Sequence, residues 1–389
     1  MIISSLFPPN IIGGAEKIAF ELAKLLSEEY EIVVVTLNLE NVDSNYQIDK
    51  INVHSIALKN SYNPFVKKQG NIGKLKKILW HINDINNKKM AIKVENIIGT
   101  ENPSIVMTHN ITGFSVEVWN LVKKYELPIV HVLHDYYLIC PKSTMYKNQI
   151  NCESQCLNCK LFSFDKKSSS QNVDAVVGVS NFVLNKHIEN GYFKNSIKMV
   201  INNALDFGKK EKSKTIVADH IVFGFIGRLA DNKGIEELLN IFKTNFSDEK
   251  IYIAGTGDEK YVNDLKDKYA SENIIFLGFT NPSDYYNMIN VNIVPSQWNE
   301  PFGMVVIESF YTATPVIGAK RGGITEMISD GFNGFLYEPN YSSELIDILK
   351  NLISGLYDIN QLSVNALETS KKYTTEILKK EYLSLLKTL

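Results

Sequence analysis

The sequence predicts an α/β protein with two domains, each a parallel sheet covered by helices, that face each other across a cleft. Three observations lead to this fold class. A chain of 389 residues is longer than one ordinary hydrophobic core accommodates. Short apolar runs alternate with amphipathic helical segments, as they do in parallel sheets with helical crossovers. This alternation is interrupted once, by a charged stretch after Asp206, and then begins again.

The first domain is predicted over residues 1–205. Its opening elements form a βαβ unit, with a strand at residues 1–5, a loop at 6–14, a helix at 15–29 and a buried strand at 30–38. Further strands are predicted at residues 104–110, 128–135, 175–180 and 197–203.

The second domain is predicted over residues 206–368, and residues 207–220 are interpreted as the linker. Strands are expected at residues 221–227, 250–257, 273–279, 291–296 and 314–320, and helices at 233–242, 259–270, 282–289 and 301–312. Residues 369–389 are predicted to form an amphipathic helix that returns to the first domain. Ligands of such sheets bind at the carboxyl ends of the strands.

The composition is that of a soluble globular protein, with 44% hydrophobic and 22% charged residues. A net charge of −2 argues against binding to nucleic acid. The amino terminus lacks the basic and apolar regions of a signal peptide, and no apolar run approaches the ~18 residues of a membrane span. We therefore expect a cytoplasmic protein.

The segment "NEPFGMVVIESF" (299–310) carries two carboxylates. Pro301 suits the first position of a helix, which predicts that Glu300 lies beside the helix start and Glu308 within it, among apolar neighbours. The helical rise would separate the two by about 12 Å, too far for a glycosidase pair, so they are expected to contact two points of an extended ligand. The alternative is a surface Glu together with a core Glu bonded to backbone.

Arginine occurs only at positions 228 and 321, each just after a predicted strand. Arg228 and Lys233, in "GRLADNKG", can both point at an anion above the sheet, where charge-assisted hydrogen bonds to phosphate are strong. Plain solvation is the alternative for both. Arg321 is expected either to face the cleft or to be structural or solvated.

These segments resemble family-four retaining glycosyltransferases, which have the two-domain GT-B fold. "NEPFGMVVIES" is similar to the E-x7-E motif of that family, "IGRLADNKG" to its diphosphate-binding Arg and Lys segment, and "IIGGAE" to its amino-terminal glycine loop. "VVGVSNF", "INNALDF" and "RGGITEMISDGFNGFLYEP" also match. The resemblance therefore extends over most of the chain.

The resemblance implies a role for each matching residue. Arg228 and Lys233 would neutralise the diphosphate of the donor without a required metal or other cofactor. Glu308 would bind the ribose hydroxyls, so that ligand satisfies the buried carboxylate.

The other roles concern the sugar and the glycine loop. Glu300, assisted by the amides of Phe302 and Gly303, would bind hydroxyls of the transferred sugar. Gly13 and Gly14 would let the backbone approach the ligand, although a GG pair by itself indicates only a flexible loop.

Two histidines end strands that are expected to face the cleft. The resemblance places His134 near the reacting sugar, and His109 is the second candidate, although a lone His at a strand end is more often structural. Retention in this family resembles a front-face substitution in which the proton of the acceptor goes to the leaving phosphate, so we name no protein nucleophile.

The predicted function is a retaining hexosyltransferase-type enzyme that moves a sugar from a UDP- or GDP-linked donor to a hydroxyl of a glycan or lipid-linked acceptor, in cell-surface polysaccharide synthesis. A catalytically inactive nucleotide-sugar-binding module is the first alternative. A dinucleotide-dependent oxidoreductase is disfavoured because "IIGGAE" lacks the G-x-G-x-x-G spacing.

All four cysteines fall within twenty residues, at Cys140, Cys152, Cys156 and Cys159. In a cytoplasmic protein this clustering predicts a structural zinc site, with free thiols and an iron–sulfur cluster as the other possibilities.

Residues 67–93 are rich in lysine and contain a single acid, Asp84, with Trp80 and aliphatic residues interleaved. Such a helix either lies at an anionic membrane surface, here the inner face of the cell membrane, or is a solvated surface helix. The lysines are Lys67, Lys68, Lys74, Lys76, Lys77, Lys88, Lys89 and Lys93.

Overall fold

The computed structural model describes residues 1–66, 72–206 and 221–389. The predicted linker at 207–220, together with Lys67 and Lys68, lies outside the described residues. The chain forms two compact units. The amino-terminal unit comprises Met1–Met145, Cys152–Asn203 and Thr375–Leu389, and the carboxyl-terminal unit comprises Tyr146–Asn151 and Ala204–Thr374.

The amino-terminal unit is built on an eight-stranded sheet with the order β10-β9-β6-β5-β1-β2-β4-β3. All neighbours in it pair in parallel except β3 and β4, which are antiparallel. Its strands are β1 (Ile2–Ile3), β2 (Ile32–Asn38), β3 (Ser44–Ile48), β4 (Ile51–Ala57), β5 (Val106–Thr108), β6 (Ile129–Leu133), β9 (Ala175–Gly178) and β10 (Ile197–Val200).

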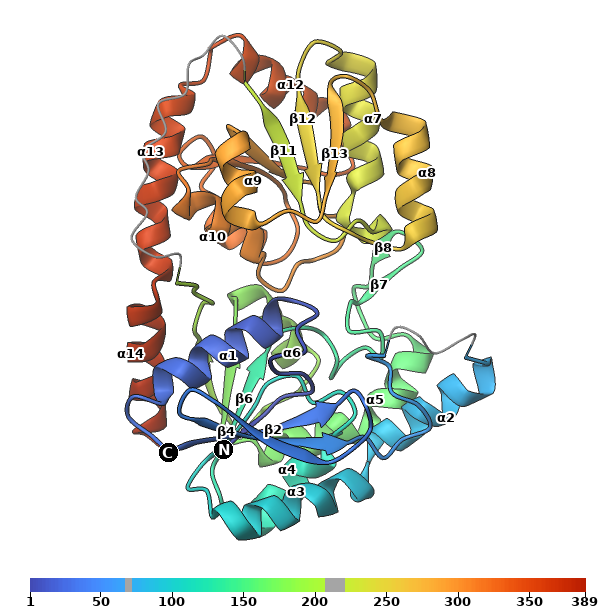
Figure 1. Ribbon diagram of the computed structural model, residues 1–389, viewed down its shortest axis with the longest axis vertical. Coiled ribbons are helices and arrows are strands. Elements are labelled where there is room, and N and C mark those ends of the chain that lie inside the picture. The colour runs from blue at the N-terminus through green and yellow to red at the C-terminus, as the bar shows by residue number, and fades with distance from the viewer. Residues whose placement is uncertain (67–71, 207–220) are drawn as a thin grey trace. The chain divides into compact units, whose positions relative to one another are not determined.

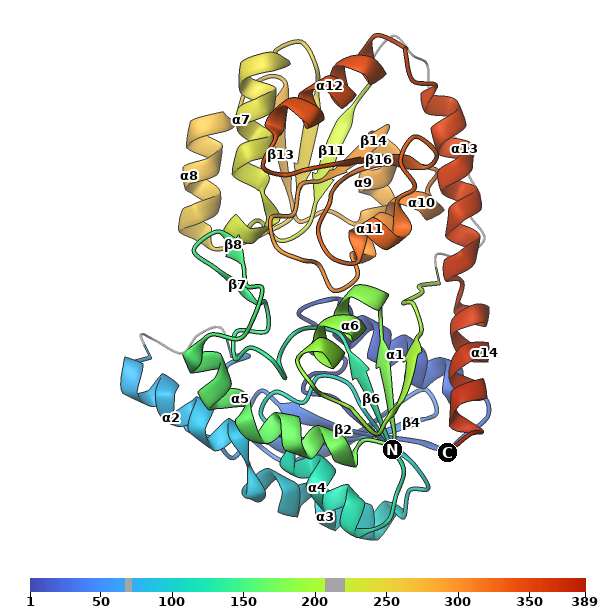
Figure 2. The ribbon, with the colours of Figure 1, turned by 180° about the vertical axis from the view of Figure 1, so that it is seen from behind.

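Helices cover both faces of this sheet, which is why β6 and β9 are buried at every position. Figures 1 and 2 show α1 on one face and α3 and α4 on the other. The helices of the unit are α1 (Gly14–Leu26), α2 (Lys74–Ile85), α3 (Lys88–Glu101), α4 (Glu117–Lys124), α5 (Leu157–Ser169), α6 (Asn181–Glu189) and α14 (Thr375–Leu386).

The carboxyl-terminal unit contains a six-stranded parallel sheet with the order β13-β12-β11-β14-β15-β16. Its strands are β11 (Phe223–Ile226), β12 (Ile251–Ala254), β13 (Ile274–Gly278), β14 (Val291–Val294), β15 (Val316–Ala319) and β16 (Gly334–Tyr337). A two-stranded hairpin, β7 (Tyr146–Lys147) with β8 (Ile150–Asn151), also belongs to this unit.

Two cores pack against the six-stranded sheet. The larger joins the strands to α7 (Ile235–Asn245), α8 (Glu259–Tyr269) and α12 (Ser342–Ile353), and the smaller forms around α9 (Pro282–Met288). The remaining helices are α10 (Met304–Tyr311), α11 (Ile324–Met327) and α13 (Ile359–Ser370).

The predicted strands are all present, and the fold class is confirmed. The sheets contain further strands that the apolar pattern does not show, such as β3, which is a polar edge strand. The predicted helix at residues 369–389 is wrong in its start, because α13 ends at Ser370 and α14 begins only at Thr375, with a 3-10 turn at Lys371–Tyr373 between them. In the described residues, no helix is long and apolar enough to cross a membrane.

Candidate active site

The order of the strands reverses between β11 and β14, which are neighbours although β12 and β13 separate them in the chain. At such a switch point the loops after the two strands diverge and leave room for a ligand. The loop after β11 carries Arg228 and Lys233, and the loop after β14 leads to Glu300. Three of the residues singled out in the sequence therefore belong to one end of one sheet.

A close backbone approach brings these two loops together. Gly234 has a φ of +70°, and a Cβ atom there would lie 1.9 Å from the carbonyl oxygen of Pro295. Only glycine fits this position, for both conformational and steric reasons. The backbone amides of Gln297 and Trp298 also donate to the carbonyl oxygen of Asn232, at 3.0 and 3.3 Å. Lys233 is thereby held against the loop that carries Glu300.

Glu300 is buried, with 7% of its surface exposed, and its carboxylate has two partners from these loops. Lys233 Nζ lies 2.5 Å from Glu300 Oε1, and Ser296 Oγ donates to the same oxygen at 2.6 Å. The group expected to bind phosphate therefore directly contacts the group expected to bind sugar. Such neighbours suit a ligand in which a sugar carbon is bonded to a phosphate oxygen.

Arg228 differs from Lys233 in its surroundings. It is exposed two residues beyond the end of β11, and within the described residues its guanidinium has no hydrogen bond or ion pair. A planar, always-charged guanidinium with open donors is suited to bidentate binding of phosphate.

Arg321 is directed toward protein groups. Its Nε donates to the carbonyl oxygen of Gln297 at 3.2 Å, and its Nη1 lies 3.9 Å from Glu338 Oε2. The side chain is 17% exposed. Arg321 therefore supports the loop before Glu300 from the side of β15.

The predicted start of the helix after Glu300 is wrong. α10 begins at Met304, and Gly303 precedes it with a φ of +105°, a left-handed conformation that cannot continue a helix from Pro301. Glu300 instead pairs with Gly322 in a β-bridge, and its carbonyl oxygen accepts from Gly323 N at 2.7 Å. The expected 12 Å helical rise between the two carboxylates therefore does not apply.

Glu308 lies within α10 as expected and is 8% exposed. The hydroxyl of Tyr286, from α9, donates to Glu308 Oε2 at 3.3 Å. Burial, with the negative charge of Glu308, raises the pKa of Tyr286 well above its usual value, so the phenol remains a donor. Protein groups thus supply part of the hydrogen bonding that this buried carboxylate requires.

Phe302 and Gly303 are the two residues of the turn that directly precede α10. Phe302 is buried, and its ring meets that of Tyr373 edge-on at a centroid distance of 6.1 Å. This contact anchors the turn, so that the amide of Gly303 lies at the start of the helix.

In the amino-terminal unit, Gly13 and Gly14 form the start of α1. The Gly13 amide donates to Glu16 Oε2 at 2.7 Å. Gly13 has an extended backbone, and a Cβ there would make only an ordinary contact at 3.4 Å. Because the fold does not require glycine at position 13, the missing side chain is available for another purpose, such as approach of a ligand.

His109 and His134 are in direct contact. His109 Nδ1 and His134 Nε2 are 2.8 Å apart, and the rings stack at a centroid distance of 5.1 Å. Burial lowers the pKa of His134 to about 4, and burial together with the neighbouring imidazoles lowers the pKa of His109 well below its usual value. Both rings are therefore neutral near neutral pH, when one can donate to the other.

The cysteines do not support the zinc prediction. None of the four cysteines, all of which lie within the described residues, forms a disulfide, and the Sγ atoms of Cys156 and Cys159 are 3.5 Å apart at the start of α5. Among the described residues no group of three or more His, Cys, Asp or Glu side chains is placed to hold a metal ion. A structural zinc site needs four converging ligands, which spacing in the sequence cannot guarantee. Cys140 is buried, whereas Cys156 is exposed.

Sequence reasoning missed Ser296, Tyr286 and Asn151, all of which contact the loop or helix of the two carboxylates. The position of Ser296 at the end of a predicted strand was an available signal. Nothing in the local sequence indicated the other two.

Two family models match the chain. A model described as Glycosyltransferase Family 4 matches residues 12–208, which are 197 of the 389 residues. A model described as Glycosyl transferases group 1 matches residues 206–368.

Similar proteins cover nearly the same length. An uncharacterised 42.6 kDa protein in the cps region of Klebsiella pneumoniae is 34% identical over 84% of this chain and 86% of its own. The lipopolysaccharide 1,2-N-acetylglucosaminetransferase of Salmonella typhimurium is 23% identical over 89% of this chain and 86% of its own. The structure of Anabaena Alr3699/HepE in complex with UDP superposes with a TM-score of 0.74, at 20% identity and with 100% of both chains covered.

Proposed function

Because the chain belongs to glycosyltransferase family 4 and has its GT-B fold, we propose that it is a retaining enzyme that transfers a sugar from a nucleotide-sugar donor to a hydroxyl of a glycan or lipid-linked acceptor. The observation that carries this proposal is the contact of Lys233 with Glu300, together with the exposed Arg228 on the same loop as Lys233. A sugar and a diphosphate that are covalently joined need such a neighbouring anion-binding and hydroxyl-binding pair.

In this proposal the donor diphosphate binds Arg228 and Lys233. Negative charge grows on the diphosphate as its bond to the sugar breaks, and the two cations stabilise that charge more than the charge of the intact donor. Lys233 then divides its hydrogen bonds between the phosphate and Glu300, since an ammonium has three donors.

The carboxylates position the rest of the donor. The Glu300 carboxylate accepts hydrogen bonds from hydroxyls of the sugar, and the amides of Phe302 and Gly303 donate hydrogen bonds to them. Glu308 accepts from the ribose hydroxyls, in addition to the hydrogen bond from Tyr286. From the resemblance we assign the neutral His134 to the reacting sugar, with His109 holding its ring.

Retention follows if the acceptor oxygen attacks the sugar on the face from which the diphosphate leaves. The bond from the sugar carbon to the phosphate oxygen breaks, the bond to the acceptor oxygen forms, and the acceptor proton passes to the leaving phosphate oxygen. Atoms and charge balance without a covalent sugar–protein intermediate.

The donor is a UDP- or GDP-linked sugar. Structures of Anabaena Alr3699/HepE contain UDP and UDP-glucose, which supports testing UDP sugars first. The chemistry of the relatives in lipopolysaccharide and capsular polysaccharide synthesis supports a cell-surface glycan as the product.

A panel of UDP and GDP sugars tests this function. We expect one donor to release free nucleotide slowly by hydrolysis, with the released sugar first appearing in the anomeric form of the donor, as NMR can show. Binding of nucleotide without any release or transfer would instead indicate an inactive binding module. Neither binding nor release with the whole panel would contradict the proposal.

We also propose that the amino-terminal unit contacts an anionic membrane, the source of lipid-linked acceptors at the inner face of the cell membrane. The helices α2 and α5 are neighbours, with the rings of His81 and Phe162 at a centroid distance of 5.5 Å. Each helix exposes an apolar stripe with helical spacing, and each stripe residue is between 46% and 84% exposed. The stripes are Leu75, Ile78, Leu79 and Ile82 on α2, and Leu157, Leu161 and Phe164 on α5.

The charge beside these stripes is positive. Lys74 and Lys76 each lie about 100° around α2 from Leu75, so that they flank its stripe. The single acid of α2, Asp84, is turned inward, where it accepts from Tyr137 Oη at 2.6 Å and from Gly113 N at 2.7 Å. An apolar stripe flanked by lysines suits a helix that lies in an anionic bilayer surface.

Co-sedimentation with vesicles tests this contact. Phosphatidylglycerol vesicles should retain the protein and phosphatidylcholine vesicles should not, and Leu79→Glu should weaken retention. Ile92→Glu is the matched control, because Ile92 is a 56% exposed residue of α3. Retention by neither kind of vesicle would favour a solvated helix, and equal retention by both would contradict the anionic preference.

A further inference from the structure

The hairpin of β7 and β8 interrupts the amino-terminal unit in sequence but packs as part of the carboxyl-terminal unit (Figures 1 and 2). Its two-residue turn, Asn148 and Gln149, has φ angles of +52° and +61°. Two positive φ angles match the tight turns that fix the register of a β-hairpin. Asn151 is the last residue of β8 and pairs with Tyr146.

Asn151 binds the backbone of the loop before Glu300 with both atoms of its side-chain amide. Its Nδ2 donates to the carbonyl oxygen of Gln297 at 2.7 Å, and its Oδ1 accepts from the amide of Asn299 at 2.8 Å. The two contacts span Trp298. This pairing uses a planar group with one donor atom and one acceptor atom, as the side-chain amide of Asn supplies.

The loop that Asn151 holds is the one that carries the sugar-binding carboxylate. Asn299 directly precedes Glu300, and the carbonyl oxygen of Gln297 also accepts from Arg321. Asn151 and Arg321 thus donate to the same backbone oxygen. Asn151 lies on a hairpin 146 residues before Gln297 in the chain. A small displacement of this loop would move the Glu300 carboxylate away from Lys233 and Ser296.

We infer that Asn151 is a positioning residue for Glu300. It acts through the backbone and does not touch the substrate. The inference rests on the proposed function, in which Glu300 binds the hydroxyls of the transferred sugar. It assigns the β7–β8 hairpin, which no sequence motif marks, to the donor site of the enzyme.

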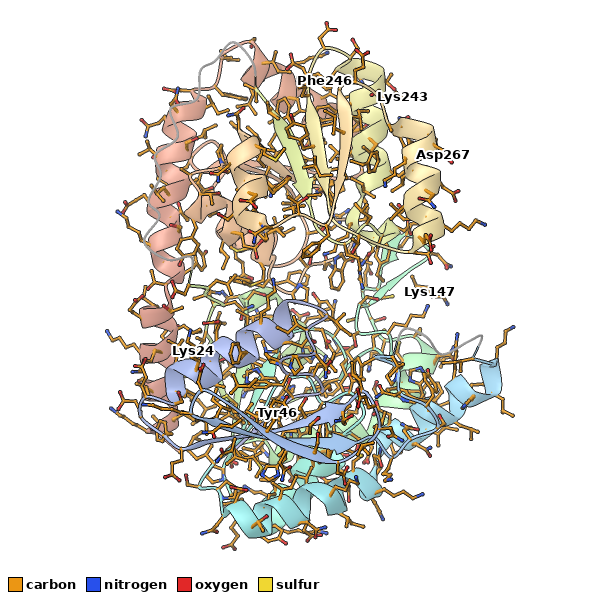
Figure 3. All side chains as sticks on the ribbon, in the orientation of Figure 1. Lys24, Tyr46, Lys147, Lys243, Phe246 and Asp267 are labelled. Carbon is orange, nitrogen blue, oxygen red and sulfur yellow. The ribbon has the colours of Figure 1, made fainter. Side chains whose placement is uncertain are left out.

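The test compares Asn151→Ala and Asn151→Asp with Lys147→Ala. Lys147 is the matched control, because it lies on the same hairpin with an exposed side chain (Figure 3). Asn151→Asp keeps the acceptor for Asn299 but places a carboxylate oxygen against the Gln297 carbonyl oxygen. Turnover of the donor, nucleotide affinity by calorimetry, and hydrogen exchange of peptides that contain residues 296–301 are measured for each variant.

We expect Asn151→Ala and Asn151→Asp to lower turnover by about 10- to 100-fold, the effect of misplacing a catalytic-site group by about 1 Å. Nucleotide affinity should change by less than about threefold, which is less than ~1 kcal/mol. The reason is that Arg228 and Glu308 lie outside the loop that Asn151 holds. The amides of the loop should exchange faster. Lys147→Ala should match the wild type in all three measurements.

The decisive readout is the combination with Glu300→Gln. If Asn151 acts through Glu300, adding Asn151→Ala to Glu300→Gln should lower turnover by less than about threefold further. Effects that multiply, or unchanged loop exchange in Asn151→Ala, would overturn the inference. Unchanged exchange overturns it whether or not a donor has been found, so its failure is distinct from a failure of the proposed function.

Discussion

The candidate residues of the two units differ in whether their side chains are charged or neutral. In the carboxyl-terminal unit, Arg228, Lys233 and Glu300 are charged groups, and two of them form an ion pair at the end of the sheet. In the amino-terminal unit, His109 and His134 are pressed together and kept neutral by burial. In the proposed reaction this difference corresponds to a division of tasks, in which charged groups bind the diphosphate and neutral ones contact an uncharged sugar.

The largest effect should come from the exposed cation. Arg228→Ala should lower kcat/KM by about 10²- to 10³-fold and weaken nucleotide binding, because a preorganised donor to the leaving group is lost. Steady-state kinetics and calorimetry measure both. Lys320→Ala is the control, since Lys320 is also an exposed cation of this unit with a carboxylate, that of Glu338, 3.6 Å away. Equal effects of the two substitutions would remove the diphosphate role of Arg228.

Glu300→Gln should affect turnover more than nucleotide affinity. The amide still accepts from Lys233 and Ser296 but no longer has a carboxylate for the sugar hydroxyls, so we expect about a 10²-fold loss of kcat. Nucleotide binding should stay within a few-fold of the wild type. Intact transfer by this variant would show that Glu300 has been given the wrong role.

The neutral state of His134 leads to a prediction about how stability depends on pH. The imidazole of His134 should titrate near pH 4 in the folded protein, against about 6.5 when unfolded, as NMR of the ring protons can measure. Because the folded pKa is lowered, the unfolded chain binds the proton more tightly. The stability that depends on a neutral His134 is then fully present above pH 6.5 and is lost as the pH falls toward 4.

Other buried groups oppose this trend. Burial raises the pKa of Asp84 and of Asp135 to about 6, which favours the folded state as the pH falls through that value. The comparison is therefore between the wild type and His134→Gln, with unfolding in urea at pH 7 and pH 5. The variant should lose less stability over this interval, and an equal loss would contradict a lowered pKa.

The smallest effect should come from Tyr286→Phe. It removes a donor from the buried Glu308, which should cost about 1–3 kcal/mol of stability. Thermal unfolding measures this cost. Because bound nucleotide would supply other donors to Glu308, the cost should be smaller in its presence. Tyr285→Phe is the control, since its hydroxyl donates to Asn292 and not to Glu308.

Much of the fold could be predicted because its signals are local. Parallel strands such as β2 and β9 are continuous apolar runs, and the helices between them have a regular apolar face. β16 begins at Gly334 and has only four residues, and β3 is polar, so neither has that signal. The start of α10 differs from the prediction because Pro301 favours a helix start locally, whereas the bridge of Glu300 to Gly322 determines the backbone there.

The sequence by itself determined the two parallel sheets, the order of their elements and the positions of Arg228, Lys233, Glu300 and Glu308 near strand ends and in a helix. These depend on periodicity and on residue types, which are properties of short segments. Only the tertiary structure decided that Lys233 pairs with Glu300 and that Arg321 and Asn151 share the carbonyl oxygen of Gln297. It also decided that, among the described residues, the thiols are not placed as a group of metal ligands. Those outcomes depend on distances between segments far apart in the chain, and such distances are set by packing of the whole unit.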